Sequence, residues 1–345
     1  MSVKIIVDRA GFDDFYGVFN TDKILDKEEI EKLFDKPSYQ KMVELFGADV
    51  KFTEKAEFGK EVDFTKKEPW VALFYEAYKL YLNGSQMGED ADPVERNIIN
   101  AVLWALNNLD KLNENVDELI KIINRAQFVE KALNYLPTIE ADVHLKIGLY
   151  IFMNNACVED DEMLLDVSFA SKLDENELND LLAHEMHHYL KQQIKGIYKS
   201  PKEGYKDITN SLFMLENEGT ADMCSFEGLS SVYELLGFAE KGVMKDVLTN
   251  STAYLKQFSN MLKNKLISND DSINLTNFLL TNQIMHPLGY TMASKIESVL
   301  GIEELRNCVG RPLEFLLKYQ EAINKTSGEK IFGSETIAKL KEIYE

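Results

Sequence analysis

The spacing of apolar residues constrains the fold of this chain more than any other feature. They recur every three or four positions, the spacing that lines one face of a helix. The pattern runs through residues 1 to about 136, as in EPWVALFYEAYKLYL and VDELIKIINRAQFVEKALNYL, and it returns from about Asp174 onward. We therefore expect a mostly helical protein whose first part is almost purely helical.

Sequence typical of strands is confined to the region after Pro137. VHLKIGLYIF (143–152) and MLLDVSFA (163–170) are short runs rich in β-branched and aromatic residues, which favour strands. The fold class is therefore predicted to be α+β, with a small antiparallel or mixed sheet. The change of pattern suggests a helical N-terminal region over 1–137 and a second domain over 138–345. Within that domain, the sheet and a long helix occupy 138–200 and a helical subdomain 205–345, although both parts could equally form one body.

Composition limits the partners and the compartment. Asp and Glu number 58 against 38 Lys and Arg, a formal net charge of −20, which repels a phosphate backbone and an anionic membrane surface. Neither nucleic acid nor a membrane is therefore expected as a partner. The N-terminal sequence lacks the apolar run of a secretory signal, and no apolar stretch approaches the roughly 18 residues of a spanning helix, which indicates a cytoplasmic protein. The three cysteines show no CxxC pattern and predict neither disulfides nor a thiolate metal site.

The segment DLLAHEMHHYL (180–190) holds three of the five histidines, inside a predicted helix. His184 and His188 are four residues apart and share one helix face, where two imidazoles can bind one metal ion. Glu185 projects about 100° around the helix from His184 and can reach a water molecule on that metal. H-E-x-x-H therefore predicts a zinc site with Glu185 as general base. His187 could pair with His184 instead, but only the spacing to His188 leaves Glu185 placed as a base.

A catalytic zinc needs a third protein ligand, and ENEGTAD (216–222) offers one. Glu218 and Asp222 are four residues apart in a helical pattern whose other positions are apolar. Carboxylates on an apolar helix face are costly unless they meet a cation. We therefore predict that Glu218 is the third ligand and that Asp222 accepts the free ring N–H of a zinc-bound histidine, with His184 as the expected partner.

Together, His184–His188 and Asn217–Asp222 resemble the gluzincin metallopeptidases, the thermolysin-like clan, whose pattern is HExxH followed by NExxxD on the next helix. LLAHEMHHYL, EGTAD and HPLGYTMA are also similar to bacterial zinc-dependent peptidase families known from sequence alone. The resemblance covers about residues 140–300. It implies a zincin-like catalytic domain with a small sheet and an active-site helix, joined to a helical N-terminal part.

The same resemblance implies further site residues. Gluzincins place a histidine or a tyrosine across the cleft to stabilise the oxyanion, and HPLGY offers His286 and Tyr290. Either residue could serve. An Asn-Ala pair on the edge strand binds the substrate backbone in that clan, and Asn155 and Ala156 occupy a comparable place before the H-E-x-x-H helix.

These observations predict a zinc-dependent peptidase with one Zn²⁺ per chain and a peptide or protein as substrate. The alternatives are a non-catalytic or regulatory binding protein on a gluzincin scaffold and a metal-dependent hydrolase that cleaves a non-peptide amide. The sequence shows no GxMxN amine-binding motif, which slightly disfavours an aminopeptidase over an endopeptidase. The specificity and the oligomeric state are left open.

Overall fold

The computed structural model describes residues 2–46, 63–88, 92–140, 142–159, 162–194, 202, 204–226, 234, 241–268 and 270–344. These residues form many helices and one small mixed sheet, so the α+β class is confirmed. Unit 1 comprises Met1–Gln127 and Asp142–Asn179, and unit 2 comprises Phe128–Ala141 and Asp180–Glu345. The boundary suggested near residue 137 falls in a segment of unit 2. In this described part of the chain, no helix has the length and apolar character needed to cross a membrane.

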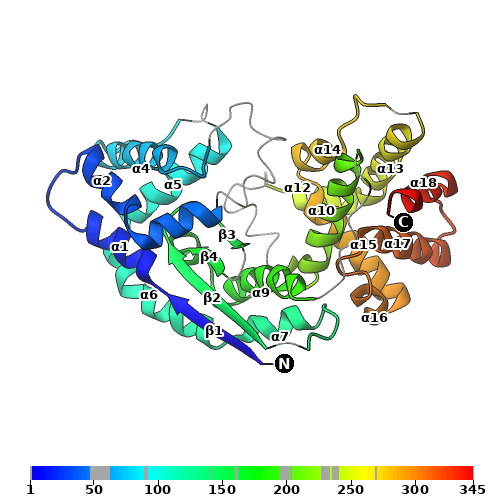
Figure 1. Ribbon diagram of the computed structural model, residues 1–345, viewed down its shortest axis with the longest axis horizontal. Coiled ribbons are helices and arrows are strands. Elements are labelled where there is room, and N and C mark those ends of the chain that lie inside the picture. The colour runs from blue at the N-terminus through cyan, green and yellow to red at the C-terminus, as the bar shows by residue number, and fades with distance from the viewer. Residues whose placement is uncertain are drawn as a thin grey trace. The chain divides into compact units, whose positions relative to one another are not determined.

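Unit 1 contains the sheet, whose four strands run in the order β1-β2-β4-β3 (Figure 1). The strands are β1 (Val3–Asp8), β2 (Val143–Tyr150), β4 (Glu162–Asp166) and β3 (Ala156–Glu159). The pairs β1–β2 and β2–β4 are parallel, with Ile5 opposite Leu145 and Ile147 opposite Met163, while β3 pairs with β4 antiparallel. The sheet is therefore mixed, and β3 lies at one edge of it.

The helices of unit 1 follow the predicted apolar periodicity. They are α1 (Ala10–Phe19), α2 (Lys27–Phe34), a helical segment over residues 37–46, α4 (Lys67–Leu82), α5 (Pro93–Asn107), α6 (Leu109–Asn124) and α8 (Val167–Ala170). Their buried faces are rich in aromatic residues. Phe74 lies against Phe15, Phe34 and Tyr39, and the Tyr39 hydroxyl donates to the backbone oxygen of Ile151 at 2.8 Å.

Two predictions about strands are corrected. The sequence pattern indicated an almost purely helical part over residues 1–136 and strands only after Pro137, yet Val3–Asp8 forms β1. The parallel partner β2 lies far away in sequence, and local periodicity cannot reveal such a pairing. The predicted strand 163–170 ends at Asp166. There the side chain accepts a hydrogen bond from the Phe169 backbone N–H and caps α8, as an N-cap residue does. The strand predicted over 143–152 is confirmed as β2, which ends at Tyr150.

The described residues of unit 2 form helices joined by turns and loops, with no strand among them. Its helices are α7 (Gln127–Leu133, with Gln127 itself in unit 1), most of α9 (Glu175–Gln192), α10 (Lys206–Asp222), α12 (Val243–Thr249), α13 (Ser251–Ile267), α14 (Leu275–Thr281), α15 (Met285–Leu300), α16 (Ile302–Arg306), α17 (Pro312–Thr326) and α18 (Ser334–Tyr344). The apolar pattern at roughly 240–266 predicts one long helix, but the structure has two helices there that meet at Asn250. The three-residue spacing of Asp174 and Glu177 predicts a capping box before α9. The structure confirms it, because Glu177 N donates to the Asp174 carboxylate while Asp174 N donates to the Glu177 carboxylate.

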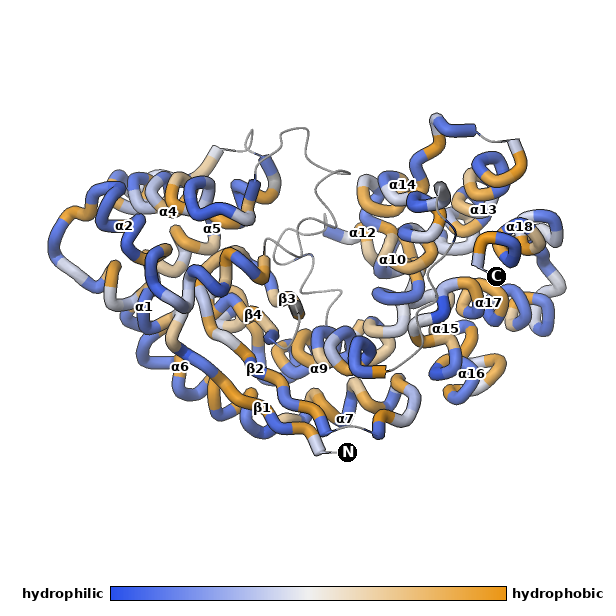
Figure 2. Tube along the Cα trace, in the orientation of Figure 1, coloured by the Kyte–Doolittle hydropathy of each residue, from blue (hydrophilic) through white to orange (hydrophobic). Residues whose placement is uncertain are grey.

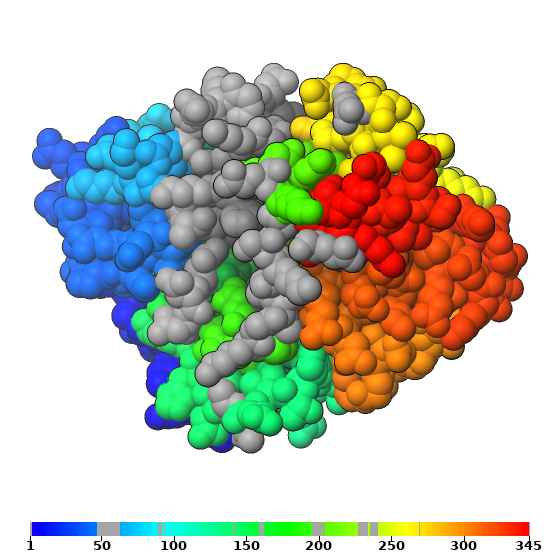
Figure 3. Space-filling model, turned by 45° about the vertical axis from the view of Figure 1, so that its right-hand side comes forward, coloured from blue at the N-terminus to red at the C-terminus, as the bar shows by residue number. Residues whose placement is uncertain are grey.

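The core of unit 2 forms where α10, α13, α15 and α17 turn their apolar faces together. Apolar and polar residues alternate around these helices in Figure 2. The buried residues include Leu212, Leu215, Phe258, Leu262, Leu288, Met292, Ile296, Leu316 and Tyr319. On the face shown in Figure 3, α13 (yellow) and α18 (red) lie side by side, as their contacts require.

Helices α10 and α15 touch backbone to backbone. An added Cβ at Gly219 would lie 2.4 Å from the carbonyl carbon of Gly289, and one at Gly289 would lie 2.6 Å from the backbone oxygen of Leu215. Real Cβ atoms essentially never come this close to backbone atoms, so any side chain here would force the two helices apart. Each glycine belongs to a motif already identified, EGTAD on α10 and HPLGY on α15. The close crossing therefore holds those two motifs together.

Candidate metal centre

Helix α9 presents the two histidines of H-E-x-x-H on one face. The Nε2 atoms of His184 and His188 lie 3.0 Å apart, and the ring centroids lie 4.6 Å apart. His184 is buried and His188 is partly buried. The one-turn spacing thus brings two imidazole nitrogens to the same point in space, as residues four apart on a helix can.

Glu218 from α10 completes a triangle of donor atoms. Its Oε2 lies 3.2 Å from His184 Nε2 and 3.3 Å from His188 Nε2. Tetrahedral zinc with bonds of 2.0–2.1 Å holds its ligand atoms about 3.3–3.4 Å apart. The observed separations of 3.0, 3.2 and 3.3 Å match that spacing closely. Three lone-pair atoms meeting in one place are a set that a divalent cation satisfies, so the residues fit zinc.

Asp222, one turn further along α10, faces two histidines at once. Its Oδ1 lies 3.1 Å from Nδ1 of His184, and its Oδ2 is hydrogen-bonded with Nδ1 of His286 at 3.0 Å. The Asp222 side chain is 0 % exposed. A fully buried carboxylate between two imidazoles fixes the orientation of both rings.

The electrostatics of the cluster favour its charged forms. Burial raises the pKa of Glu218, but the nearby His188, His184 and His286 outweigh it and hold that pKa well below the usual range. Conversely, burial lowers the pKa of His184, and the carboxylates of Asp222 and Glu218 together raise it well above the ordinary value. The carboxylates of Glu218 and Asp222 therefore make this place favourable for positive charge.

A second combination of donors also converges. One donor atom from each of His184, Glu218 and His286 lies within 4.8 Å of the others. The nearest approach of His286 to Glu218 Oε2 is by Nδ1 at 3.8 Å, and that nitrogen is already engaged by Asp222. The triangle made with His188 is tighter and its atoms have the correct spacing for zinc, so we take it as the stronger candidate.

Glu185 and Tyr290 occupy the same unit. Glu185 is buried on α9, directly after His184 in sequence. Tyr290 lies on α15, four residues after His286, and its ring stacks on Phe226 with centroids 4.1 Å apart. Helix α15 thus carries both residues expected to stabilise an oxyanion.

The remaining predicted residues, Asn155 and Ala156, belong to unit 1. Asn155 precedes β3, and Ala156 is its first residue. The backbone oxygen of Asn155 accepts a hydrogen bond from Asp166 N at 3.1 Å. The pair therefore starts the edge strand of the sheet, the kind of strand that was expected to carry it.

His187 differs from its neighbours. It is 0 % exposed, and burial, with the nearby His188 and Lys191, lowers its pKa well below the usual range. Its ring is consequently neutral at pH 7. Its centroid lies 6.3 Å from that of His188, and the donor triangle is complete without it, so His187 is part of the packing around α9.

Three polar residues beside the triangle were given no role from the sequence: Lys191, Glu216 and Asn217. The Lys191 ammonium group is buried and ion-paired with Glu216. The available signal was position, because Lys191 follows His188 by three residues on the same helix face. Such a lysine is usually a solvated surface residue, and only the packing reveals its burial.

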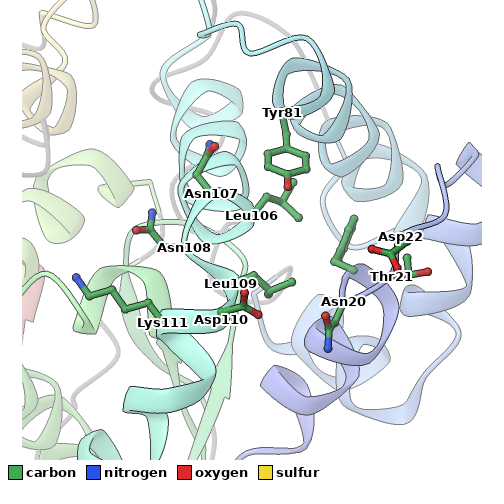
Figure 4. A pocket seen from close by; sticks show the side chains of 11 residues that line it. Asn20, Thr21, Asp22, Tyr81, Leu106, Asn107, Asn108, Leu109, Asp110 and Lys111 are labelled. Carbon is green, nitrogen blue, oxygen red and sulfur yellow. The ribbon is translucent and has the colours of Figure 1, made fainter.

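Unit 1 has a hollow of about 590 Å³. It is lined mainly by polar side chains from the ends of α1, α4 and α5 and the start of α6 (Figure 4). Figure 4 shows Lys111 pointing away from Asn20 and Asp22, on the far side of the hollow. None of the predicted catalytic or metal-binding residues lines it, and its polar groups do not converge on one point.

Comparison with known families also points to zinc. A family model described as "Putative zinc dependent peptidase (DUF5700)" matches residues 30–328, which include all of the predicted site residues. The chain belongs to this family. No curated protein and no solved structure gives a match.

Proposed function

We propose that the chain is a gluzincin-type zinc peptidase, in which His184, His188 and Glu218 bind one zinc ion per chain. The observation that carries the proposal is the triangle of donor atoms at 3.0, 3.2 and 3.3 Å, read together with membership of a family described as zinc-dependent peptidases. The proposal includes a zincin-like fold, in which α9 is the active-site helix and β3 is the edge strand.

Zinc, when bound, would polarise the scissile carbonyl and lower the pKa of a water molecule, so that this water can give up a proton and attack the carbonyl near neutral pH. Glu185 takes the proton from that water and passes it to the leaving amine. Asp222 accepts the Nδ1–H of His184, which leaves Nε2 as the ligand atom.

Further residues act on the substrate. The oxyanion is stabilised by His286 or Tyr290, each of which carries a polar hydrogen on α15. Asn155 and Ala156 hydrogen-bond the substrate backbone at the start of the edge strand.

Two measurements test the proposal. Protein purified without added metal should contain about one zinc per chain, and His188→Ala should lose it, while His144→Ala in unit 1 should not. Glu185→Gln should keep the zinc and lose peptide hydrolysis by about 10²-fold or more. The matched control is Glu175→Gln on the exposed first turn of α9, which should keep both. Full hydrolysis by Glu185→Gln would overturn the mechanism, and a chain without zinc would overturn the metal site.

A further inference from the structure

A buried ion pair lies next to the proposed ligand Glu218. Lys191 of α9 is 1 % exposed, and Glu216 of α10 is fully buried. The Lys191 ammonium group donates to Glu216 Oε1 at 2.8 Å, to Glu216 Oε2 at 2.7 Å and to Oδ1 of Asn217 at 3.0 Å. A lysine has three N–H donors, so this set of acceptors uses all of them. The backbone N–H of Gly310 also donates to Glu216 Oε1 at 2.9 Å.

Stability alone is a poor explanation for this pair. Removing two charges from water costs several kcal/mol per ion, and a well-packed apolar pair of similar volume is often as stable or more so. A buried ion pair is better explained if it orients a neighbouring side chain. Besides Glu216, the Lys191 ammonium group lies over the ring of Phe213 and donates a hydrogen bond to Asn217, the direct neighbour of Glu218.

The side-chain amide of Asn217 has an oxygen and a nitrogen, and the hydrogen bond with Lys191 fixes which direction each of them faces. An amide side chain carries an acceptor oxygen and a donor nitrogen of nearly equal size. Lys191 can only donate, so it requires the oxygen of Asn217. The amide nitrogen must then face the other way, where Nδ2 donates to Glu218 Oε1 at 2.9 Å. The ammonium group therefore fixes the direction of a hydrogen bond that it does not itself make.

The orientation of Asn217 in turn determines which oxygen of Glu218 belongs to the triangle of donor atoms. Since Oε1 of Glu218 is held by Asn217, Oε2 is the oxygen presented to His184 and His188. We propose that Lys191 is a positioning residue: through Asn217 it holds Glu218 so that Oε2 serves as a single-oxygen metal ligand. This inference rests on the proposed zinc site and adds a specific support for it.

The experiment measures zinc affinity by competition with a chelator. Lys191→Met combined with Glu216→Gln removes both charges, leaves no unpaired buried ion and keeps an acceptor for Gly310 N. The dissociation constant for zinc should rise about 10- to 100-fold, the usual effect of losing a residue that orients a ligand. Asn217→Leu should weaken binding by a similar factor. Both Lys191→Met/Glu216→Gln and Asn217→Leu should also change the absorption spectrum of the cobalt-substituted protein, because each alters the geometry of Glu218 at the metal.

Combining the variants separates positioning from general damage. If Lys191 acts through Asn217, the triple variant should bind zinc about as tightly as Asn217→Leu alone, because residues of one network are not additive. The control is Lys265→Met in the same unit, whose Nζ pairs with Asp207 of α10 at 2.9 Å. It should leave zinc affinity and the cobalt spectrum unchanged.

Three results would overturn the proposal. One is unchanged zinc affinity in Lys191→Met/Glu216→Gln whose circular dichroism shows it to be folded. Another is a triple variant in which the separate effects simply add. The third is an unaltered chain that binds no zinc, which would overturn the proposed function and this inference with it.

Discussion

Each unit holds a carboxylate with little or no exposure to solvent, Asp166 in unit 1 and Glu218 in unit 2, but the two carboxylates have different surroundings. In unit 1, Asp166 accepts hydrogen bonds from Phe152 N at 2.7 Å, Phe169 N at 3.0 Å and the Ser168 hydroxyl. In unit 2, Glu218 accepts a hydrogen bond from Asn217 Nδ2 at Oε1, while its Oε2 faces the Nε2 atoms of His184 and His188. The three hydrogen bonds to Asp166 account for its place in the fold. The Oε2 atom of Glu218 instead meets two imidazole nitrogens at the spacing of metal ligands, which distinguishes a candidate metal site from a structural network.

The largest expected effect tests that difference directly. At free zinc about 1,000 times the dissociation constant, binding should raise the free energy of unfolding by about 4 kcal/mol. Glu218→Gln should abolish this gain, whereas Asp166→Asn should keep it. Chemical denaturation with and without zinc measures both. An undiminished zinc effect in Glu218→Gln would show that the two carboxylates do not differ in this way.

The next effect concerns the backbone contact between α10 and α15, next to Glu218. Gly219→Ala places a methyl group against the backbone of Gly289, so α10 and α15 must separate at a cost of about 3 kcal/mol. Zinc affinity should fall as well, because Glu218 precedes this glycine. Gly17→Ala is the matched control: it is also helical, its added Cβ meets nothing within 4 Å, and it should be neutral or slightly stabilising. Equal stability of the two variants would contradict the close crossing.

A smaller loss of stability is expected when Asp166, the carboxylate held by the fold, is replaced. Asp166→Asn puts an amide where three donors converge, so at least one buried donor loses its acceptor, at a cost of about 2 kcal/mol. The metal content should not change. A thermal melt and a zinc assay on the same preparation check both statements, and loss of zinc in this variant would remove the contrast between the two carboxylates.

The smallest effect depends on pH and on Asp207, a structural carboxylate within unit 2. Burial raises its pKa, but the N–H groups of Leu275 and Thr276 at the start of α14, together with Lys265, lower it below its ordinary value of 3.8. Its contribution is therefore present above pH 3.8 and is lost as the pH falls through the lowered pKa. Asp207→Asn should be about 1 kcal/mol less stable than the unaltered chain at pH 7.

The difference in the free energy of unfolding between Asp207→Asn and the unaltered chain should be smaller at pH 3 than at pH 7. Urea denaturation of both proteins at the two pH values measures it, and the other carboxylates cancel in the comparison. A gap that widens in acid would mean that the folded state does not favour the ionised form of Asp207.

Much of the site could be predicted from sequence because its determinants are local. The H-E-x-x-H spacing, the carboxylates of ENEGTAD and the capping box at Asp174 each depend on residues within one or two helical turns. The sequence also singled out His286, which α15 brings to Asp222. Local periodicity is therefore sufficient to find the helices and the chemical groups they carry.

The features that escaped prediction all depend on distant partners. Strand β1 needs β2, which lies about 140 residues later, to be recognised as a strand. Lys191 looks like a surface residue until Glu216 from another helix is seen beside it. The helical crossing at Gly219 and Gly289 joins two motifs that nothing in the sequence connects. The sequence identifies the chemical groups, whereas long-range packing decides how they are held.

The glycine crossing has a consequence for anyone who would transfer this donor set to another scaffold. At Gly219 and Gly289 the main chains of α10 and α15 are in direct contact, so no side-chain rotamer can rearrange to accept a larger residue at that point. A minimal graft would accordingly carry Gly219 and Gly289 along with the histidines and carboxylates. A graft that copied only the polar residues would place His286 on a helix too far away to reach Asp222.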